Sequence, residues 1–214
     1  MMLDFMNILG RIKQETKASI FKVTRNFVRP PFPQLETGEI NLNLGCGFIN
    51  HPHFINIDCL PLPHVHYIRS IDNLSPFATE SVDLIYASHS LEHFPHSQTK
   101  QVLTEWFRVL KKGGVLRLSV PDFDLLVKIY EQNSYDVELI LHPLMGSQNY
   151  KYNFHMTAFN SQYLSKLLKS VGFKLVQPWE PGTSEQTTFN DFSVGKLPVN
   201  EKEYPVSLNL EAIK

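Results

Sequence analysis

Residues Gly45-Cys46-Gly47 and the acid Asp58 form the most informative pattern in this chain. The glycines end one apolar run, and Asp58 ends the next run, residues 54–57. A turn without side chains at 45 and 47 lets a ligand approach the backbone closely, and a carboxylate after the second run can accept hydrogen bonds from both hydroxyls of a ribose. The spacing therefore indicates a site for an adenosine-containing cofactor.

The dinucleotide fingerprint G-x-G-x-x-G fits this turn poorly. Asn50 stands where the third glycine would be. Asp58 also follows far sooner than the ~20 residues that this fingerprint requires. An NAD site is therefore disfavoured. Because a glycine pair also fits a plain tight turn, the assignment depends on the motifs that follow.

Further motifs follow the glycine turn in a fixed order. They read NID at 56–58, VDLIYASHSLEHF at 82–94, LKKGGVLRLSVPDF at 110–123 and HMTAFNSQYLSKLLKSVGF at 155–173. Together with NLGCG at 43–47, this set resembles the class I S-adenosylmethionine-dependent methyltransferases, particularly the short bacterial members with an LGCG-type first motif. The resemblance covers about residues 38–178 and implies an enzyme with a Rossmann-like fold that uses S-adenosyl-L-methionine.

The resemblance also implies which residues bind the cofactor. The glycine turn would lie against its amino-acid part, Asp58 would hold the ribose, and the segments after the third and fourth strands would border the adenine and the methionine side. The residues expected to line the cofactor are Gly45, Cys46, Gly47, Asp58, Cys59, Ile71, Asp72, Ser88 and His89. Asn43 stands where many relatives carry an acid, so the ammonium contact credited to that acid is in doubt here.

A catalytic base is needed only if the methyl acceptor is a hydroxyl or another protonated group. The catalytic candidates are His155, His89 and Asp122. A histidine titrates near neutrality and suits this role. His155 is favoured because the family places its acceptor-binding elements between the fifth strand and the next helix. The alternative for His155 is a structural hydrogen bond.

The stretch 89–93 also reads H-x-x-E-H, a zinc hydrolase signature in which both histidines project from one helix face. Here the stretch directly follows an expected strand, 82–87, so His89 is predicted to lie in a loop. The H-x-H pairs at 51–53 and 64–66 lack the cysteine or carboxylate companions of a metal site. No metal site is predicted.

Length and composition favour one globular domain. The chain has 214 residues, of which 43% are hydrophobic and 19% charged, and its formal net charge is -1. This charge gives no electrostatic case for nucleic acid as the main partner. Two cysteines suggest a reducing compartment. There is no apolar run near the ~20 residues of a membrane span, and the first ten residues include Asp4, so we expect a soluble, cytoplasmic protein.

The chain is expected to divide into residues 1–33 and 34–214. Apolar residues at near-helical spacing predict an amphipathic helix over residues 3–28, and the prolines at 30–33 end it and form a linker. This helix would pack on the domain or on a partner chain; the alternative is peripheral contact with an anionic membrane surface. Residues 34–214 would form the methyltransferase-like domain.

From residue 40 onward, strands alternate with connectors, which predicts a mostly parallel, seven-stranded α/β sheet of the Rossmann-like class I methyltransferase fold. Strands are expected at 40–44, 54–57, 65–69, 82–87, 114–120, 173–178 and 206–213, and helices at about 97–111, 122–132 and 160–171. The connections 47–54 and 59–63 are too short or too rich in proline for the first crossover helices. One sheet face would then need cover from the N-terminal helix or from a homodimer partner.

The expected function is S-adenosylmethionine-dependent transfer of a methyl group to a small-molecule or glycan-type acceptor. The alternative is a methyltransferase-like domain that binds the cofactor weakly or not at all and serves as a partner-binding or scaffold subunit.

Overall fold

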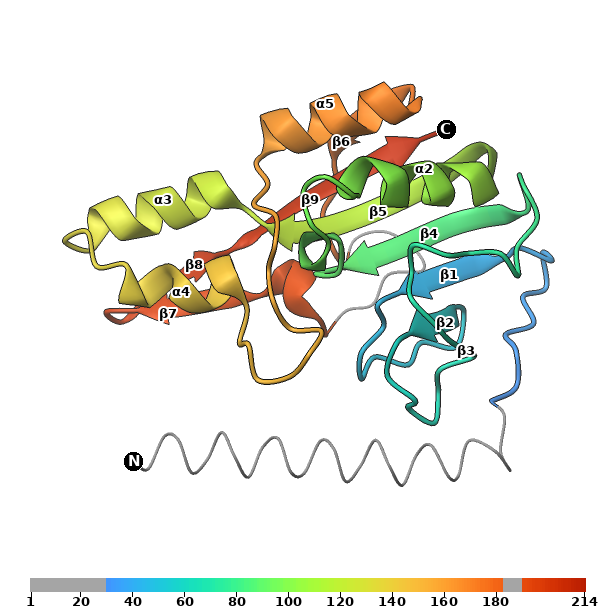
Figure 1. The fold of residues 1–214 in the computed structure, drawn as a ribbon, viewed down its shortest axis with the longest axis horizontal. Coiled ribbons are helices and arrows are strands. Elements are labelled where there is room, and N and C mark those ends of the chain that lie inside the picture. The colour runs from blue at the N-terminus through green and yellow to red at the C-terminus, as the bar shows by residue number, and fades with distance from the viewer. Residues whose placement is uncertain (1–29, 183–189) are drawn as a thin grey trace.

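The computed structural model describes residues 30–182 and 190–214, so the predicted N-terminal amphipathic helix lies outside the described residues. A seven-stranded sheet with the order β3-β2-β1-β4-β5-β9-β6 forms the centre of the domain (Figure 1). Its strands are β1 (Asn41–Leu44), β2 (Ile55–Asp58), β3 (Tyr67–Ile68), β4 (Val82–Ser88), β5 (Leu110–Pro121), β6 (Leu175–Pro178) and β9 (Ser207–Ile213). Strands β1 to β5 pair in parallel, and β9 runs antiparallel to β5 and β6. The predicted fold class is confirmed.

The helices are α2 (Thr99–Val109), α3 (Phe123–Gln132), α4 (Glu138–Met145) and α5 (Ser161–Val171), with short 3₁₀ turns η1 (Leu91–His93) and η2 (Phe192–Val194). Helices α2, α3 and α5 match the three predicted helices. Helix α4 and the hairpin β7 (Lys196–Val199)–β8 (Lys202–Pro205) were not predicted. Pro143 lies inside α4, where a sequence pattern indicates a break. No helix in the described ranges is both long and apolar enough to cross a membrane.

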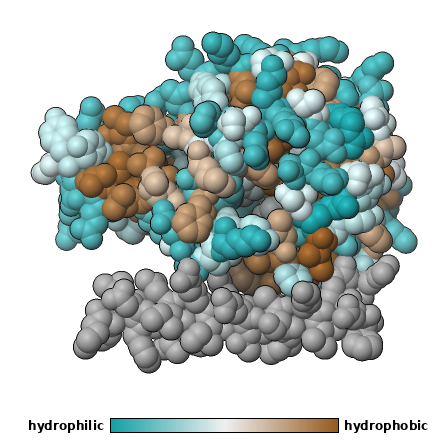
Figure 2. Space-filling view, viewed as in Figure 1, coloured by the Kyte–Doolittle hydropathy of each residue, from teal (hydrophilic) through white to brown (hydrophobic). Residues whose placement is uncertain are grey.

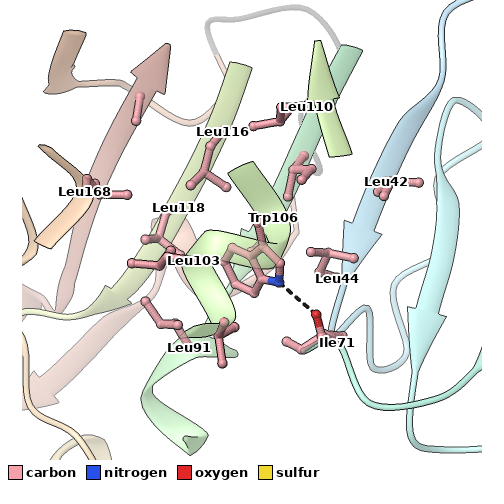
Figure 3. Close-up of a cluster of buried hydrophobic side chains, with 14 of the residues drawn as sticks. Leu42, Leu44, Ile71, Leu91, Leu103, Trp106, Leu110, Leu116, Leu118 and Leu168 are labelled. Carbon is pink, nitrogen blue, oxygen red and sulfur yellow. Dashed lines mark hydrogen bonds between the residues drawn. The ribbon is translucent and has the colours of Figure 1, made fainter. Parts of the chain in front are cut away.

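One face of the sheet is apolar and carries α2 and α5, which lie side by side over it in Figure 1. Alternate residues of β1, β4 and β5 point into this layer, as Figure 3 shows for Leu44, Leu116 and Leu118. Trp106 of α2 is fully buried there, and its Nε1–H donates to the carbonyl of Ile71 at 2.8 Å. The core therefore fixes the loop that follows β3.

The opposite face is polar beside β1 and β2, where the crossover helices are missing as predicted. Asn43 and Asn56 are directly paired across these strands and are buried, and Asn43 Nδ2 donates to Asn56 Oδ1 at 3.4 Å. Asn56 Nδ2 in turn donates to Asn50 Oδ1 at 3.0 Å and to the His64 carbonyl at 3.1 Å. These side-chain hydrogen bonds provide partners for polar groups that would otherwise be buried without any, because two short loops stand here in place of helices.

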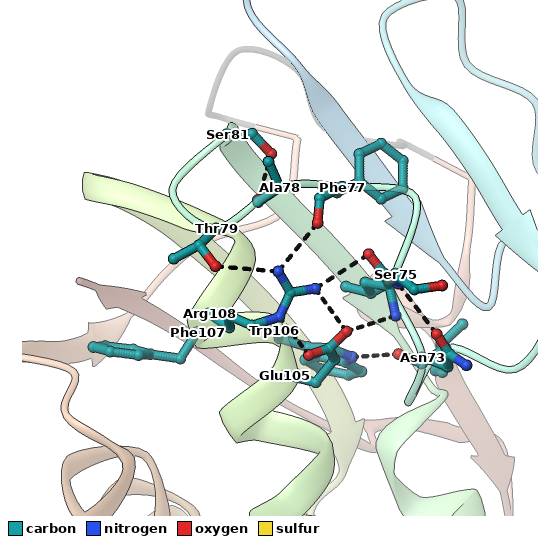
Figure 4. Close-up of polar contacts among 12 residues, drawn as sticks. Asn73, Ser75, Phe77, Ala78, Thr79, Ser81, Glu105, Trp106, Phe107 and Arg108 are labelled. Carbon is teal, nitrogen blue, oxygen red and sulfur yellow. Dashed lines mark hydrogen bonds and ion pairs between the residues drawn. The ribbon is translucent and has the colours of Figure 1, made fainter.

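An ion pair on α2 holds the segment between β3 and β4 (Figure 4). Arg108 donates to both carboxylate oxygens of Glu105, at 2.7 and 2.9 Å, and to the carbonyls of Phe77 and Leu74. Glu105 also accepts the Leu74 amide at 2.8 Å. The hydrogen bonds from Arg108 lower the pKa of Glu105. The pair therefore fastens the backbone of this segment to the helix.

Replacing Trp106 with Phe should lower the free energy of unfolding by about 1–3 kcal/mol, because it leaves the Ile71 carbonyl without its donor in the core. Trp179→Phe is the matched control, because Trp179 Nε1 is buried and has no hydrogen-bond partner in the described part of the chain. Urea denaturation measures both variants. Equal losses would show that ring volume, not the hydrogen bond to Ile71, matters at position 106.

Candidate functional site

The glycine turn after β1 has the conformation that its sequence predicts. Gly45 and Gly47 have φ angles of +69° and +50°. A Cβ on Gly45 would lie 2.6 Å from the Cβ of Ser90, whereas a Cβ on Gly47 would meet no atom within 4 Å. The first glycine is thus required by close packing against the loop after β4. The second faces open space, which is the side from which a ligand can approach.

Asp58 ends β2 beside this turn. Its Oδ2 accepts the amide of Gly47 and its Oδ1 accepts the amide of Leu60, both at 2.8 Å. Burial raises the pKa of the Asp58 carboxyl above its usual range, although these bonds partly oppose the shift. The carboxylate is therefore held by the backbone at the edge of the turn.

The two cysteines lie beside Asp58 but do not offer reactive thiols. The Cys46 side chain packs with Leu62 and Val65, so only its backbone faces the turn. Burial and the charge of Asp58 raise the pKa of both the Cys46 and the Cys59 thiol. A thiol with a raised pKa is a poor nucleophile at neutral pH.

The loop after β3, which carries the predicted cofactor residues Ile71 and Asp72, approaches the glycine turn through Ile71. Ile71 Cδ1 is 3.9 Å from the position that a Cβ on Gly45 would take. Asp72 is exposed, and its charge contributes to the raised pKa of Cys59. Lys151 has the opposite effect on Cys59, so the loop after α4 also reaches this side of the site. Lys151 was not among the residues predicted for the site.

Two serines at the end of β4 have hydroxyl groups that no other described residue satisfies: Ser88 is the last residue of the strand, and Ser90 follows it. Ser88 Oγ and Ser90 Oγ are buried and make no hydrogen bond with any described residue. Ser88 was a predicted cofactor residue, whereas Ser90 was not singled out. A buried hydroxyl without a partner is unfavourable, so both atoms are suited to a polar ligand group.

The His89 ring lies in contact with Ser207 and Glu92. Its φ of +49° is uncommon for a residue other than glycine. Ser207 Oγ donates to the Phe192 carbonyl, so the contact of 2.8 Å between His89 Nε2 and Ser207 Oγ has His89 as donor. His89 Nδ1 then faces Glu92 Oε1 at 3.3 Å. Both ring nitrogens have partners, and neither is directed to a ligand.

Glu92 is the buried centre of a second polar group. Its exposed fraction is 0%, and neither carboxylate oxygen makes a hydrogen bond within the described ranges. Burial opposes its ionisation, but the contact with His89 and the nearby rings of His93 and His155 lower its pKa overall. The sequence marked Glu92 only as part of the H-x-x-E-H pattern.

His155 joins this group because its segment is hydrogen-bonded to η1. The amides of Met156 and Thr157 donate to the Glu92 carbonyl at 2.8 and 3.2 Å. His155 Nδ1–H donates to the Pro143 carbonyl at 3.0 Å, and Nε2 lies 3.9 Å from Glu92 Oε1. Burial lowers the pKa of His155 despite the attraction of Glu92. Because Nδ1 is engaged by the carbonyl, Nε2 is the ring nitrogen that faces Glu92.

Asp122, the third catalytic candidate, begins α3. Its Oδ1 accepts the amide of Asp124 at 3.0 Å, which is an N-cap. Burial raises the pKa of the Asp122 carboxyl. Asp122 therefore caps α3. His155, and not Asp122, lies close to the buried Glu92.

Comparisons with known proteins agree with the fold described above. A family model described as a methyltransferase domain matches residues 60–118. No curated protein matches the chain. Among solved structures, a SAM-dependent methyltransferase and possible histamine N-methyltransferase from Thermotoga maritima has a TM-score of 0.52 and 19% identity, over 82% of each chain. A SAM-dependent methyltransferase from Archaeoglobus fulgidus has a TM-score of 0.50 and 14% identity, over 94% of each chain.

A third solved structure is the 1,6-didemethyltoxoflavin-N1-methyltransferase of Burkholderia thailandensis with bound 1,6-didemethyltoxoflavin and S-adenosylhomocysteine. It has a TM-score of 0.51 and 13% identity, and the match covers 94% of this chain and 77% of that chain. At these identities the solved structures show the shared fold. With the family model, which is described as a methyltransferase domain, this fold confirms the predicted resemblance to class I methyltransferases; the LGCG-type subgroup stays a prediction.

Gly45→Ala and Gly47→Ala should differ sharply in stability. The first adds a contact of 2.6 Å and a strained φ, so we expect a loss of about 2–5 kcal/mol in the free energy of unfolding. The second adds only the strained φ, with an expected loss of about 1–2 kcal/mol. Urea denaturation compares them, and similar losses would contradict the packing of Gly45 against Ser90.

Proposed function

We propose that this chain, whose fold and motif order are those of class I methyltransferases, transfers a methyl group from S-adenosylmethionine to a small-molecule or glycan-type acceptor. The observation that carries the proposal is the glycine turn joined to Asp58 through the Gly47 amide. The turn follows β1. The hydroxyls of Ser88 and Ser90, which have no partner among the described residues, lie at the end of β4. The order of the strands along the sheet reverses between β1 and β4. Open α/β sheets bind ligands at this position.

The donor atoms on the chain fit the cofactor. A carboxylate has about four lone-pair positions. Asp58 uses two of them for the amides of Gly47 and Leu60, so one on each oxygen is left for a ribose hydroxyl. Ser88 and Ser90 offer hydroxyl donors for its amino-acid part. When bound, the cofactor supplies an electrophilic methyl group on its sulfonium.

The acceptor would lie beside the segment that follows α4. Phe154 and Met156 flank His155 and are exposed, and Phe192 is exposed in contact with the His89 ring. Figure 2 shows further apolar side chains on this side of the molecule over α4, where Leu141 and Met145 are exposed. Aromatic and apolar surfaces suit a ring or the apolar face of a sugar. A formal net charge of -1 does not suit a nucleic acid.

The protein's contribution to methyl transfer is mainly to hold the acceptor in line with the methyl group. If the acceptor is protonated, His155 is the best-placed base among the predicted candidates. Its Nδ1–H is fixed by the Pro143 carbonyl, so Nε2 carries the lone pair. His89 and Asp122 are engaged by Ser207 and by the α3 amide, respectively.

One observation favours the alternative of a scaffold domain without strong cofactor binding. Asn43 replaces the acid of many relatives, and its amide donates to Asn56. Its Nδ2 group therefore serves the sheet, and the neutral amide lacks the negative charge with which an acid would hold an ammonium group. Titration with S-adenosylhomocysteine separates the two functions, because only the enzyme needs a well-populated complex.

S-Adenosylhomocysteine should bind the purified chain, and Asp58→Asn should weaken binding by about 10- to 150-fold, the effect of losing hydrogen bonds to a charged group. Because the pKa of Asp58 is raised, affinity of the unaltered chain should decline on acidification at a higher pH than an ordinary aspartate would give. Affinity is retained above that pKa and lost below it. Isothermal titration calorimetry across pH measures both effects.

Glu131→Gln is the control for Asp58→Asn, because Glu131 is an exposed acid on α3 and is not among the residues expected to line the cofactor. It should change affinity far less than the Asp58 variant. Equal affinity in all three proteins would remove the ribose assignment. No binding by the unaltered chain would favour the scaffold function.

His155→Ala should leave the affinity for S-adenosylhomocysteine nearly unchanged but should lower turnover of a methylated acceptor by about 10²–10⁴-fold, as for a lost general base. Measurements of binding and turnover on the same preparation test this. Normal turnover per folded molecule, with only a lower melting temperature, would assign His155 a structural role.

A further inference from the structure

We propose that Glu92, His93 and His155 bind one divalent transition-metal ion, such as Zn²⁺, Co²⁺ or Mn²⁺. One donor atom from each of these residues lies within 4.8 Å of the others. We predicted no metal site at the H-x-x-E-H pattern, because its two histidines were not expected to project from one helix face. The structure instead joins Glu92 and His93 to a third ligand from beyond β5.

The buried carboxylate of Glu92 is the first argument for a cation. Both of its oxygens are inaccessible and lack a hydrogen bond among the described residues. His89 Nδ1 lies 3.3 Å and His155 Nε2 lies 3.9 Å from Oε1 of Glu92. A buried carboxylate needs a positive charge or several donors beside it. A metal ion between Glu92 and the two rings would supply that charge.

The orientation of the two rings is the second argument. His93 Nδ1–H donates to the Phe154 carbonyl at 3.1 Å, and His155 Nδ1–H donates to the Pro143 carbonyl at 3.0 Å. A carbonyl only accepts, so both rings have the tautomer with a lone pair on Nε2. Metal-binding histidines are typically oriented in this way, by a carbonyl or carboxylate on the other nitrogen.

The segment that carries His155 is held in place without a metal. The Glu92 carbonyl accepts the amides of Met156 and Thr157, and Thr157 Oγ1 donates to the Phe94 carbonyl at 2.7 Å. The rings of His93 and His155 lie edge to face with centroids 5.0 Å apart. Small side-chain rotations could therefore bring the donors to the ~2.0–2.2 Å of metal–ligand bonds.

The donor set defines the class of ion. Two imidazoles and one carboxylate suit first-row transition metals, whereas Mg²⁺ and Ca²⁺ prefer oxygen ligands. Three protein ligands leave at least one coordination position for water or an acceptor oxygen. The metal site itself does not depend on methyl transfer; only a role in acceptor binding rests on the proposed function. His155 can serve as a base only in the metal-free chain, because a metal-bound Nε2 has no free lone pair.

The test uses the full chain without an affinity tag, freed of metal with a chelator and titrated with Co²⁺ and with Zn²⁺. We expect one ion per chain by calorimetry and d–d absorption from bound Co²⁺. His93→Gln and His155→Gln should each weaken binding by more than the ~10–100-fold that loss of an outer partner causes. Glu92→Gln should have the same effect and keeps the shape of the side chain.

Two control variants separate this site from other histidines. His96→Gln alters an exposed residue near η1, and the double variant His51→Gln/His53→Gln removes an H-x-H pair whose ring centroids are 5.1 Å apart. Both should bind Co²⁺ as the unaltered chain does. Circular dichroism and S-adenosylhomocysteine binding show that each variant is folded, and they test the proposed function separately.

Absence of Co²⁺ and Zn²⁺ binding by the unaltered, folded chain would overturn the proposal. A hydrogen bond between His89 and Glu92 would then account for the contact between these two side chains. Binding that survives in folded His93→Gln and His155→Gln, or that disappears in the double variant at 51 and 53, would also overturn it.

Discussion

The contact between the glycine turn and the end of β2 is the constraint on which the rest of the site depends. The amide of Gly45 donates to the Ile57 carbonyl at 2.9 Å, and the amide of Gly47 donates to Asp58. Ser90 then packs so closely on Gly45 that no side chain fits. The segments after β1, β2 and β4 are thus held together at one edge of the sheet, where a ligand can reach all three.

The hydrophobic core supports this edge through α2. Trp106 fixes the carbonyl of Ile71, whose side chain reaches toward Gly45, and Arg108 with Glu105 fastens the segment that follows. Loops that carry binding residues need such anchors, because their own backbone has few regular hydrogen bonds. Amide side chains perform the same task at β1 and β2, where Asn56 connects Asn43 to neighbouring loops. The short connections therefore do not leave these strands without support.

The sequence by itself determined the positions along the chain of the strands of the seven-stranded sheet, the helices α2, α3 and α5, and the glycine turn after β1. Each of these follows from local chemistry: apolar alternation along strands, helical spacing, and turn residues that tolerate positive φ. Because parallel strands end at one edge, the cofactor residues could be brought together from their positions after successive strands. Their functional roles stay predictions. Helix α4 and the β7–β8 hairpin were missed, since Pro143 inside the helix and Pro198 and Pro205 inside the two strands give the opposite local signal.

Only the tertiary structure decided the surroundings of Glu92. The sequence placed His89 and His93 near it but gave no reason to bring His155 to the same carboxylate. That proximity results from backbone hydrogen bonds between η1 and a segment far along the chain. The tautomers of His93 and His155 likewise depend on the carbonyls of Phe154 and Pro143. Burial, hydrogen-bond partners and charge are properties of packed neighbours, and residue spacing does not contain them.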